Sequence, residues 1–234
     1  MRELNTYGLT AAETNQSSAL FFLPLCGFPR IFRFMVSRNC LKCGADLGAG
    51  FGWARMVNCG HCGTAHILRD EVFELAGNAG VLHEAPGLLR LGEELETPEG
   101  AFRAVGVVRF SYGRGAWDEF WALDDAGEGA WISVDEGDIV LQRPIMGKGF
   151  PASPPAPGLS IRYHNRDWIV TEAETAHCIG FRGHLPEVFA LDDKFTFVNA
   201  SSGDGQLLSG EFWPGGSAWF VGNWLDPFTL TVAA

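Results

Sequence analysis

Basic residues are few in this 234-residue chain. It has 17 Lys and Arg residues against 28 Asp and Glu residues, which gives a formal net charge of −11. Up to Asp70 there are 7 basic and 4 acidic residues, whereas from Glu71 onward there are 10 basic and 24 acidic ones. An acidic body of this kind repels polyanions and opposes the counterion release that drives nucleic-acid binding. We therefore expect no nucleic-acid partner.

A long apolar run is also missing. The stretch from Ala19 to Phe28 is interrupted by Pro24 and is about half as long as the ~20 residues that a membrane span needs. A signal-peptide core is an alternative, but Glu3 and Glu13 weaken the basic region that should precede it. We expect no transmembrane span, a cytoplasmic location and at most a peripheral association with a membrane system. Residues 1–38 are interpreted as an N-terminal extension, either a non-native start or a disordered segment.

Established catalytic motifs are absent as well. The chain has no phosphate-binding glycine loop, no G-x-S-x-G elbow and no H-E-x-x-H helix. A second metal site or an acid/base pair is conceivable where three histidines and two glutamates lie in the last third of the chain: His164, His177, His184, Glu172 and Glu174. None of the three histidines has a partner at the i, i+2 or i, i+4 spacing of metal ligands. The sequence therefore predicts no catalytic residues and leans towards a protein that is not an enzyme.

Four of the six cysteines form two identical pairs, Cys40-x-x-Cys43 and Cys59-x-x-Cys62, with fifteen residues between the pairs. This spacing lets four thiolates reach one tetrahedral Zn²⁺ ion. Glycine follows each pair, where a positive φ would direct backbone N–H groups towards the sulfurs. The sequence predicts a zinc ribbon over residues 39–69. Because protein thiolates fill every position, the zinc should support the fold and perform no chemistry.

Other uses of these cysteines remain open. Two disulfides, a thioredoxin-like redox pair, or a site in which His61 or His66 replaces one thiolate are the alternatives. Cys26 and Cys178 are interpreted as buried or incidental thiols. This pattern of cysteine use suits a reducing compartment.

The rest of the chain predicts a mainly β fold. Residues 70–87 read as a linker with a short helix, because a weak amphipathic pattern is broken there by glycines. Short β-branched and aromatic runs with Gly and Asp turns then predict two small antiparallel barrel- or sandwich-like units, over residues 88–143 and 158–234. A Pro-rich connector over residues 144–157 separates them.

The aromatic residues of the first β unit are a candidate site. In an extended strand Trp117, Glu119 and Trp121 share one face, and Trp131 lies across the next hairpin. Core packing explains such a row of rings, since large aromatic side chains dominate cores. The functional alternative is a surface that grips a partner protein, which makes these four residues a possible partner surface.

Several motifs carry a resemblance to a known family. They are a W-x-E-aromatic element (Trp117, Glu119, Phe120), a G-x-W-[IL] element (Gly129, Trp131, Ile132) and a G-x-L-P element (Gly183, Leu185, Pro186). With the preceding ribbon, they make residues from about 39 to the C-terminus similar to the bacterial domain of unknown function 4178. His184 departs from the pattern, because the family often has an acid there. The resemblance implies no known activity and suggests an accessory component of bacterial membrane-stress or polyamine-linked systems.

The sequence therefore predicts a zinc-binding accessory or adaptor protein that docks a partner protein without being an enzyme. The alternative is a hydrolase or transferase that uses Glu119, Glu172 or Glu174 in an aromatic cleft, where burial would raise a carboxyl pKa. Convergence of two or more of these carboxylates in one pocket would favour that alternative. The oligomeric state does not follow from the sequence.

Overall fold

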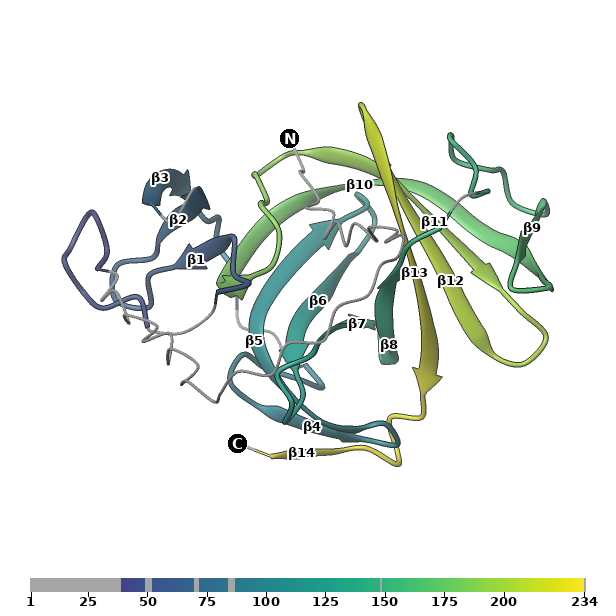
Figure 1. Cartoon of the computed structure of the whole chain (residues 1–234), viewed down its shortest axis with the longest axis horizontal. Helices are drawn as coiled ribbons and strands as arrows, with labels where there is room; N and C mark the ends of the chain where they lie inside the picture. Colours follow the sequence, from purple (N-terminus) through teal and green to yellow (C-terminus); the bar gives the residue numbers. More distant parts are fainter. Residues whose placement is uncertain (1–38, 49–51, 70–71, 84–86, 148, 234) are drawn as a thin grey trace, which may run out of the picture.

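The computed structural model describes residues 39–48, 52–69, 72–83, 87–147 and 149–233. The regular secondary structure in these ranges consists of β-strands (Figure 1). These ranges contain no helix, and hence none that could cross a membrane. The prediction of a mainly β fold is confirmed. The expected N-terminal extension, residues 1–38, lies outside the described residues.

The described part of the chain forms fourteen strands. The predicted ribbon contributes β1 (Met56–Asn58) and β2 (Thr64–Arg69), and the predicted linker contributes β3 (Val72–Asn78). The first predicted unit contributes β4 (Glu94–Thr97), β5 (Gly100–Ser111), β6 (Ala116–Leu123), β7 (Gly129–Asp135) and β8 (Asp138–Ile145). The second contributes β9 (Ser160–Tyr163), β10 (Arg166–Leu185), β11 (Lys194–Ser201), β12 (Gln206–Trp213), β13 (Gly216–Leu225) and β14 (Thr231–Ala233).

Eight of these strands close into a cylinder. The antiparallel order β5-β6-β7-β8-β13-β12-β11-β10 returns to β5, because β10 pairs with β5 from Cys178↔Phe110 to Gly183↔Gly106. The strands predicted in two units are thus hydrogen-bonded to each other along two seams, β8–β13 and β5–β10. The Pro-rich segment is the connection between β8 and β9, and it begins after Ile145. Eight strands leave an interior that side chains can fill or that can hold one small ligand.

Alternation along the strands gives the cylinder an interior and an exterior. Trp117, Glu119 and Trp121 on β6 point inward, whereas Phe120 and Ala122 point outward into a separate apolar cluster. A second outer cluster gathers around Trp168, Val198 and Trp219. The cylinder therefore has one interior core and two outer cores, which the outlying strands β4, β14 and β9 help to cover (Figure 1).

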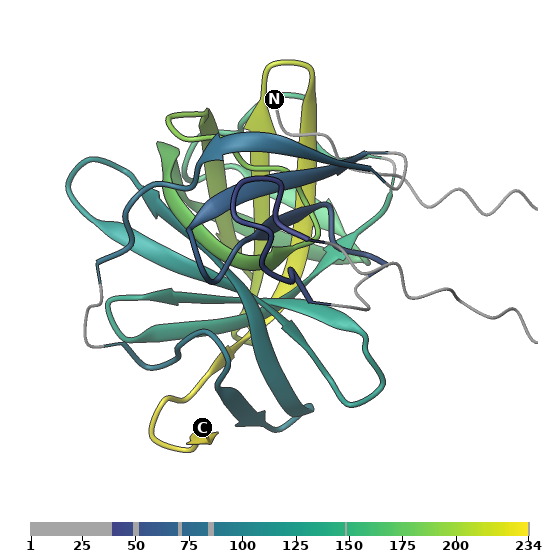
Figure 2. The ribbon, with the colours of Figure 1, turned by 90° about the vertical axis from the view of Figure 1, so that its left-hand side faces the viewer.

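The ribbon is joined to one end of the cylinder. β1 pairs with the last residues of β10, Met56↔Leu185 and Val57↔His184, and Figure 2 shows the ribbon in front of the cylinder strands. Met56, Ala65 and Ala79 belong to the interior core cluster, and the rings of Trp53 and Trp121 lie 6.0 Å apart. The ribbon and the cylinder therefore share a core.

The prediction of a short helix within residues 70–87 is wrong. Val72–Asn78 form β3, which pairs with β2 from Arg69↔Val72 to Thr64↔Asn78. Its glycines had suggested a broken helix, but Gly77 adopts a positive φ of 93° beside the irregularity between Ala65 and His66 in the ladder. Pairing with β2 thus outweighs the weak helical pattern.

Candidate functional site: a four-cysteine centre and an acidic cavity

The four predicted zinc ligands converge. The Sγ atoms of Cys40, Cys43, Cys59 and Cys62 all lie within 4.8 Å of one another. Cys40 and Cys62 have their sulfurs 3.5 Å apart, and Cys43 and Cys59 have theirs 3.7 Å apart. A tetrahedral ion with Zn–S bonds of about 2.3 Å requires sulfurs about 3.8 Å apart. The cluster can therefore hold a metal ion.

The two cysteine pairs sit on equivalent turns. Gly44 N donates to Cys40 O at 2.8 Å, and Gly63 N donates to Cys59 O at 2.9 Å, with φ of 75° at Gly44 and 72° at Gly63. The backbone N–H of Lys42 also points at the Cys40 sulfur, at 3.4 Å. Both glycines accordingly take the conformation that their position after a C-x-x-C pair predicts.

Two asparagines that the sequence reasoning missed fix these turns. Asn39 Nδ2 donates to Gly44 O at 2.8 Å, and Asn58 Nδ2 donates to Gly63 O at the same distance. Each asparagine immediately precedes a C-x-x-C-G segment, so the repeat could have been read as N-C-x-x-C-G. Thr64 adds hydrogen bonds that lower the pKa of the Cys62 thiol to about 6, whereas contact with the other thiols helps to raise the pKa of the Cys43 thiol to about 12.

The histidines beside the cluster are not among its ligands. His61 is exposed on its turn, whereas His66 is fully buried and accepts a hydrogen bond from Leu41 N through Nε2 at 3.2 Å. This acceptor role puts the His66 proton on Nδ1. His164, His177 and His184 form no three-member group of metal-ligand side chains within the described ranges. His184 instead contacts Leu47 O at 3.1 Å.

The prediction that the four aromatic and acidic residues of the first β unit form an exposed partner surface is wrong. Trp117, Glu119, Trp121 and Trp131 are all buried, with exposed fractions of 2–9%. The face prediction itself is confirmed, because Trp121 pairs with Trp131 across the β6–β7 ladder and their rings lie 5.1 Å apart. That face points into the cylinder, since the sheet closes around it. It is unavailable to a docking protein.

Inside the cylinder, the same face lines a cavity of about 200 Å³, which we call the acidic cavity. Seven of the eight cylinder strands contribute to it, and Tyr112 adds a side chain from just beyond the end of β5. It is lined by Tyr112, Trp117, Glu119, Ser133, Asp135, Asp138, Val140, Gln142, Glu172, Phe197, Asn199, Leu207, Ser209, Gly210, Glu211 and Trp224. Five of these residues are acidic, four are aromatic and none is basic.

The deep part of the acidic cavity is polar but almost inaccessible from outside. Glu119, Gln142 and Glu211 are each more than nine-tenths buried. Trp117 Nε1 donates to Glu119 Oε1 at 3.1 Å, and Ser209 Oγ donates to Gln142 Oε1 at 2.9 Å. The deep part of the cavity thus combines two buried carboxylic side chains with a buried amide and a hydroxyl group.

The mouth of the acidic cavity carries three further acids. Asp135 and Glu172 are half-buried there and Asp138 is exposed, next to the partly exposed ring of Trp224. Burial raises the pKa of Asp135, and the neighbouring charges of Glu136, Glu172 and Asp138 raise it further. Among the described residues, the buried Oδ1 of Asp135 has no hydrogen-bond partner.

Two of the three carboxylates proposed for catalysis meet in this cavity. Glu119 and Glu172 both line it, whereas Glu174 lies outside it and forms an ion pair with Arg114 at the surface. Arg114 also reaches Glu172, at 3.9 Å, but it does not line the cavity. The residues that sequence reasoning missed are Gln142, Ser209 and Glu211. They lie on strands whose inward direction only the closure of the sheet defines.

A family model described as a domain of unknown function (DUF4178) matches residues 90–227. This segment extends from just before β4 to just after β13 and contains the whole acidic cavity. The four-cysteine cluster lies before it. Neither the curated proteins nor the solved structures include a match to this chain.

Proposed function

The chain belongs to the family of the domain of unknown function (DUF4178), and we propose that it is a non-enzymatic binding protein that takes a small organic cation into the acidic cavity. Zinc held by Cys40, Cys43, Cys59 and Cys62 supports the fold beside this binding domain.

The observation that carries this proposal is the burial of polar side chains at positions where apolar side chains would cost less free energy to bury. Glu119, Gln142 and Glu211 are more than nine-tenths buried and line a cavity that also contains four aromatic rings. Removing a carboxylate from water costs several kcal/mol even when it is hydrogen-bonded. A cationic ligand would offset part of that cost through its attraction to the two buried carboxylates. Buried polar groups that line a cavity are the expected mark of a binding site.

The charge of the cavity favours a cation. Five acidic side chains line it without a lysine or an arginine, so an anion entering it would meet repulsion on every side. The rings of Trp117, Phe197 and Trp224 can pack against the carbon atoms of a ligand and attract an ammonium group through their faces. An alkyl ammonium ion satisfies both features. A linear amine would also suit the polyamine-linked setting that the family resemblance implies.

The metal is proposed to be zinc in a structural role. Four thiolates at tetrahedral spacing are the ligand set that zinc prefers, and they leave no position for water or substrate. A reducing, cytoplasmic compartment would keep these thiols available to the ion. An accessory role in a bacterial membrane-stress or polyamine-linked system is part of this proposal. We do not include docking of a partner protein in this proposal, because the tryptophans expected to form the docking surface are buried.

A second candidate is a hydrolase or transferase. It is favoured by the convergence of Glu119 and Glu172 in one aromatic-lined cavity. The two candidates differ in the fate of the ligand. An amine recovered unchanged after prolonged incubation supports binding alone, whereas a change in its mass would favour the enzyme.

The test uses ligands matched in shape and different in charge. The thermal midpoint of the zinc-loaded full chain is measured with butylammonium and 1,4-diaminobutane, and with butanol and butyrate as neutral and anionic counterparts. Stabilisation by the amines alone is expected, because ligands that bind the native state raise its midpoint. Ser209→Leu should abolish the effect by filling the cavity. Equal shifts with butanol, or shifts that survive Ser209→Leu, would contradict the proposal.

A further inference from the structure

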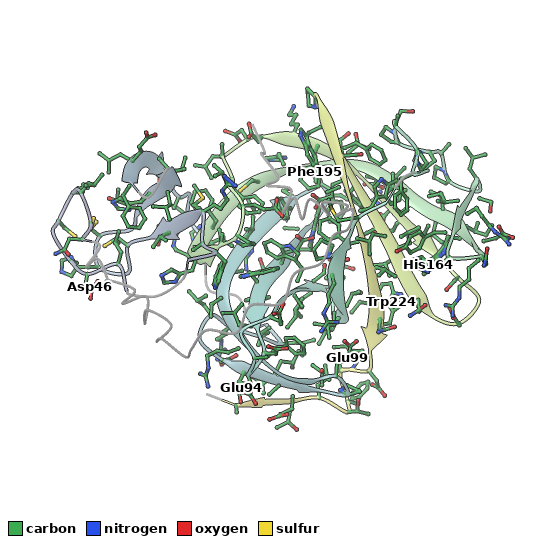
Figure 3. The ribbon with its side chains drawn as sticks, viewed as in Figure 1. Asp46, Glu94, Glu99, His164, Phe195 and Trp224 are labelled. Carbon is green, nitrogen blue, oxygen red and sulfur yellow. The ribbon has the colours of Figure 1, made fainter. Side chains whose placement is uncertain are left out.

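A second hollow lies at the other end of the cylinder interior. It has a volume of about 440 Å³ and is lined mainly by Phe110, Cys178, Phe189, Phe195 and Trp213. We call it the aromatic cavity. Figure 3 shows Phe195, one of its wall residues, near the upper end of the cylinder, while Trp224 of the acidic cavity lies towards the lower end.

Trp117 separates the two cavities. Its ring lines the acidic cavity and packs against two wall residues of the aromatic cavity, with ring centroids 5.1 Å from Phe110 and 6.4 Å from Phe195. The hydrogen bond from Trp117 Nε1 to Glu119 fixes the indole in this position. The interior is therefore divided into two compartments of different chemistry.

The aromatic cavity holds its charges only at its rim. Asp192, Asp193 and Lys194, where the β10–β11 connection meets β11, are its charged residues. Deeper inside, Phe110 and Cys178 are almost fully buried, and the nearest ring pair, Phe110 and Phe195, lies 5.1 Å apart edge to face. The interior wall thus offers ring faces, ring edges and a polarisable sulfur, with no buried charge to neutralise.

The aromatic cavity opens to solvent at its rim, where Ala190, Asp192, Asp193, Lys194 and Pro214 are exposed, whereas Phe110, Cys178, Phe189 and Phe195 are buried. Apolar wall atoms that face the hollow lack partners for dispersion contacts. About 440 Å³ falls within the ~300–1,000 Å³ of ordinary ligand pockets. A ligand of matching shape would recover the missing contacts, whereas water would find few polar partners deep in the cavity.

We propose that the aromatic cavity is a second binding site, for an uncharged aromatic molecule. Four of its wall residues are aromatic, and aromatic pairs gain stability beyond the area that they bury. A charged ring would lose its hydration with no opposite charge in the interior to replace it. This inference is independent of cation binding, because the two cavities share no lining residue.

The test titrates N-phenyl-1-naphthylamine, an uncharged aromatic fluorophore, into the zinc-loaded full chain. Saturable, blue-shifted fluorescence is expected, and naphthalene should displace the dye. 1-Decanol and 1-naphthoate should compete at least tenfold less well. Decanol competing as well as naphthalene would overturn the aromatic class. Failure of the dye to bind at all would overturn the site.

Two substitutions locate the binding. Cys178→Phe fills the cavity from its floor, and Ala190→Trp fills it from its exposed rim without altering the packed core. Either one should weaken dye binding at least tenfold in protein whose circular dichroism is unchanged. Ser209→Leu, which fills the acidic cavity, should leave dye binding unchanged. Equal loss with Ser209→Leu, or no loss with Ala190→Trp, would contradict the assignment.

A chemical readout complements the fluorescence. With the four zinc ligands protected by the metal, N-ethylmaleimide can reach Cys178 only through the aromatic cavity, because its side chain is 2% exposed. Peptide mass mapping should show that naphthalene slows alkylation of Cys178 severalfold, while butylammonium does not. Equal protection by both compounds would contradict two independent sites.

Discussion

Trp117 donates the hydrogen of its indole Nε1 to the Glu119 carboxylate at 3.1 Å, and both side chains lie inside the closed sheet. The bond joins i and i+2 on β6, so it needs only that the strand be extended. It aims a carboxylate at the acidic cavity and holds the ring that separates this cavity from the aromatic one. This single pair of neighbouring side chains therefore helps to shape both cavities.

The first prediction concerns the metal. We expect one Zn²⁺ per chain by elemental analysis, and loss of that zinc together with a lower thermal midpoint in Cys59→Ser, because metal binding supplies folding free energy to a small ribbon. Leu41→Ala, on the other cysteine turn, is the control, because Leu41 is exposed and this variant should keep its zinc. Zinc-free wild-type protein purified under reducing conditions would contradict this account.

The second prediction concerns the core shared by the ribbon and the cylinder. Met56 of β1 is 1% exposed and belongs to the interior cluster of the cylinder. Met56→Ala should therefore lower the free energy of unfolding of the whole chain by about 2–5 kcal/mol, measured in urea. The matched surface change is Leu41→Ala. If Met56→Ala costs no more than that control, the ribbon contributes little to the core.

The third prediction is a pH dependence of amine binding. In the free protein, burial and the charges of Glu136, Glu172 and Asp138 raise the pKa of Asp135, so it stays protonated above its usual range. An ammonium ligand favours the ionised form and must displace that proton. Affinity should therefore rise as pH increases through the raised pKa and level off above it.

Calorimetry at several pH values checks this trend. Asp135→Asn should bind more weakly at neutral pH and lose most of the slope. Affinity that falls with rising pH across the same window would show that Asp135 does not face the ligand.

The fourth prediction concerns nucleic acid. The excess of acids after residue 70 and the scarcity of basic residues should prevent appreciable binding of DNA or RNA at ~150 mM salt. Fluorescence anisotropy with labelled single and double strands is the measurement. Micromolar binding with a steep salt dependence would mean that the small basic ribbon outweighs the acidic body.

The local features of this chain could be predicted from sequence, whereas the closure of the sheet could not. Cysteine spacing identified Cys40, Cys43, Cys59 and Cys62, because two knuckles need only short-range geometry. The strand pattern also placed Trp117, Glu119 and Trp121 on one face. Alternation alone does not say whether such a face turns inward or outward.

Closure depends on pairings between residues that lie far apart in the chain. Cys178 of β10 pairs with Phe110 of β5, and Leu225 of β13 pairs with Ile139 of β8. No sequence pattern near these residues predicts such long-range strand pairing. At Gly106 the approach is so close that an added Cβ would collide with the His184 carbonyl. Glycine is therefore needed there, which only the paired structure makes evident.

The most direct test of the central claim is isothermal titration calorimetry of 1,4-diaminobutane with zinc-loaded wild type, Glu211→Gln and Glu174→Gln. Glu211 is buried in the acidic cavity, whereas Glu174 pairs with Arg114 outside it. We predict one amine per chain, and a roughly tenfold or greater loss of affinity in Glu211→Gln alone, the size expected for a charge-assisted hydrogen bond. Absence of binding to wild type, or equal affinity of the three proteins, would contradict cation binding in the cavity.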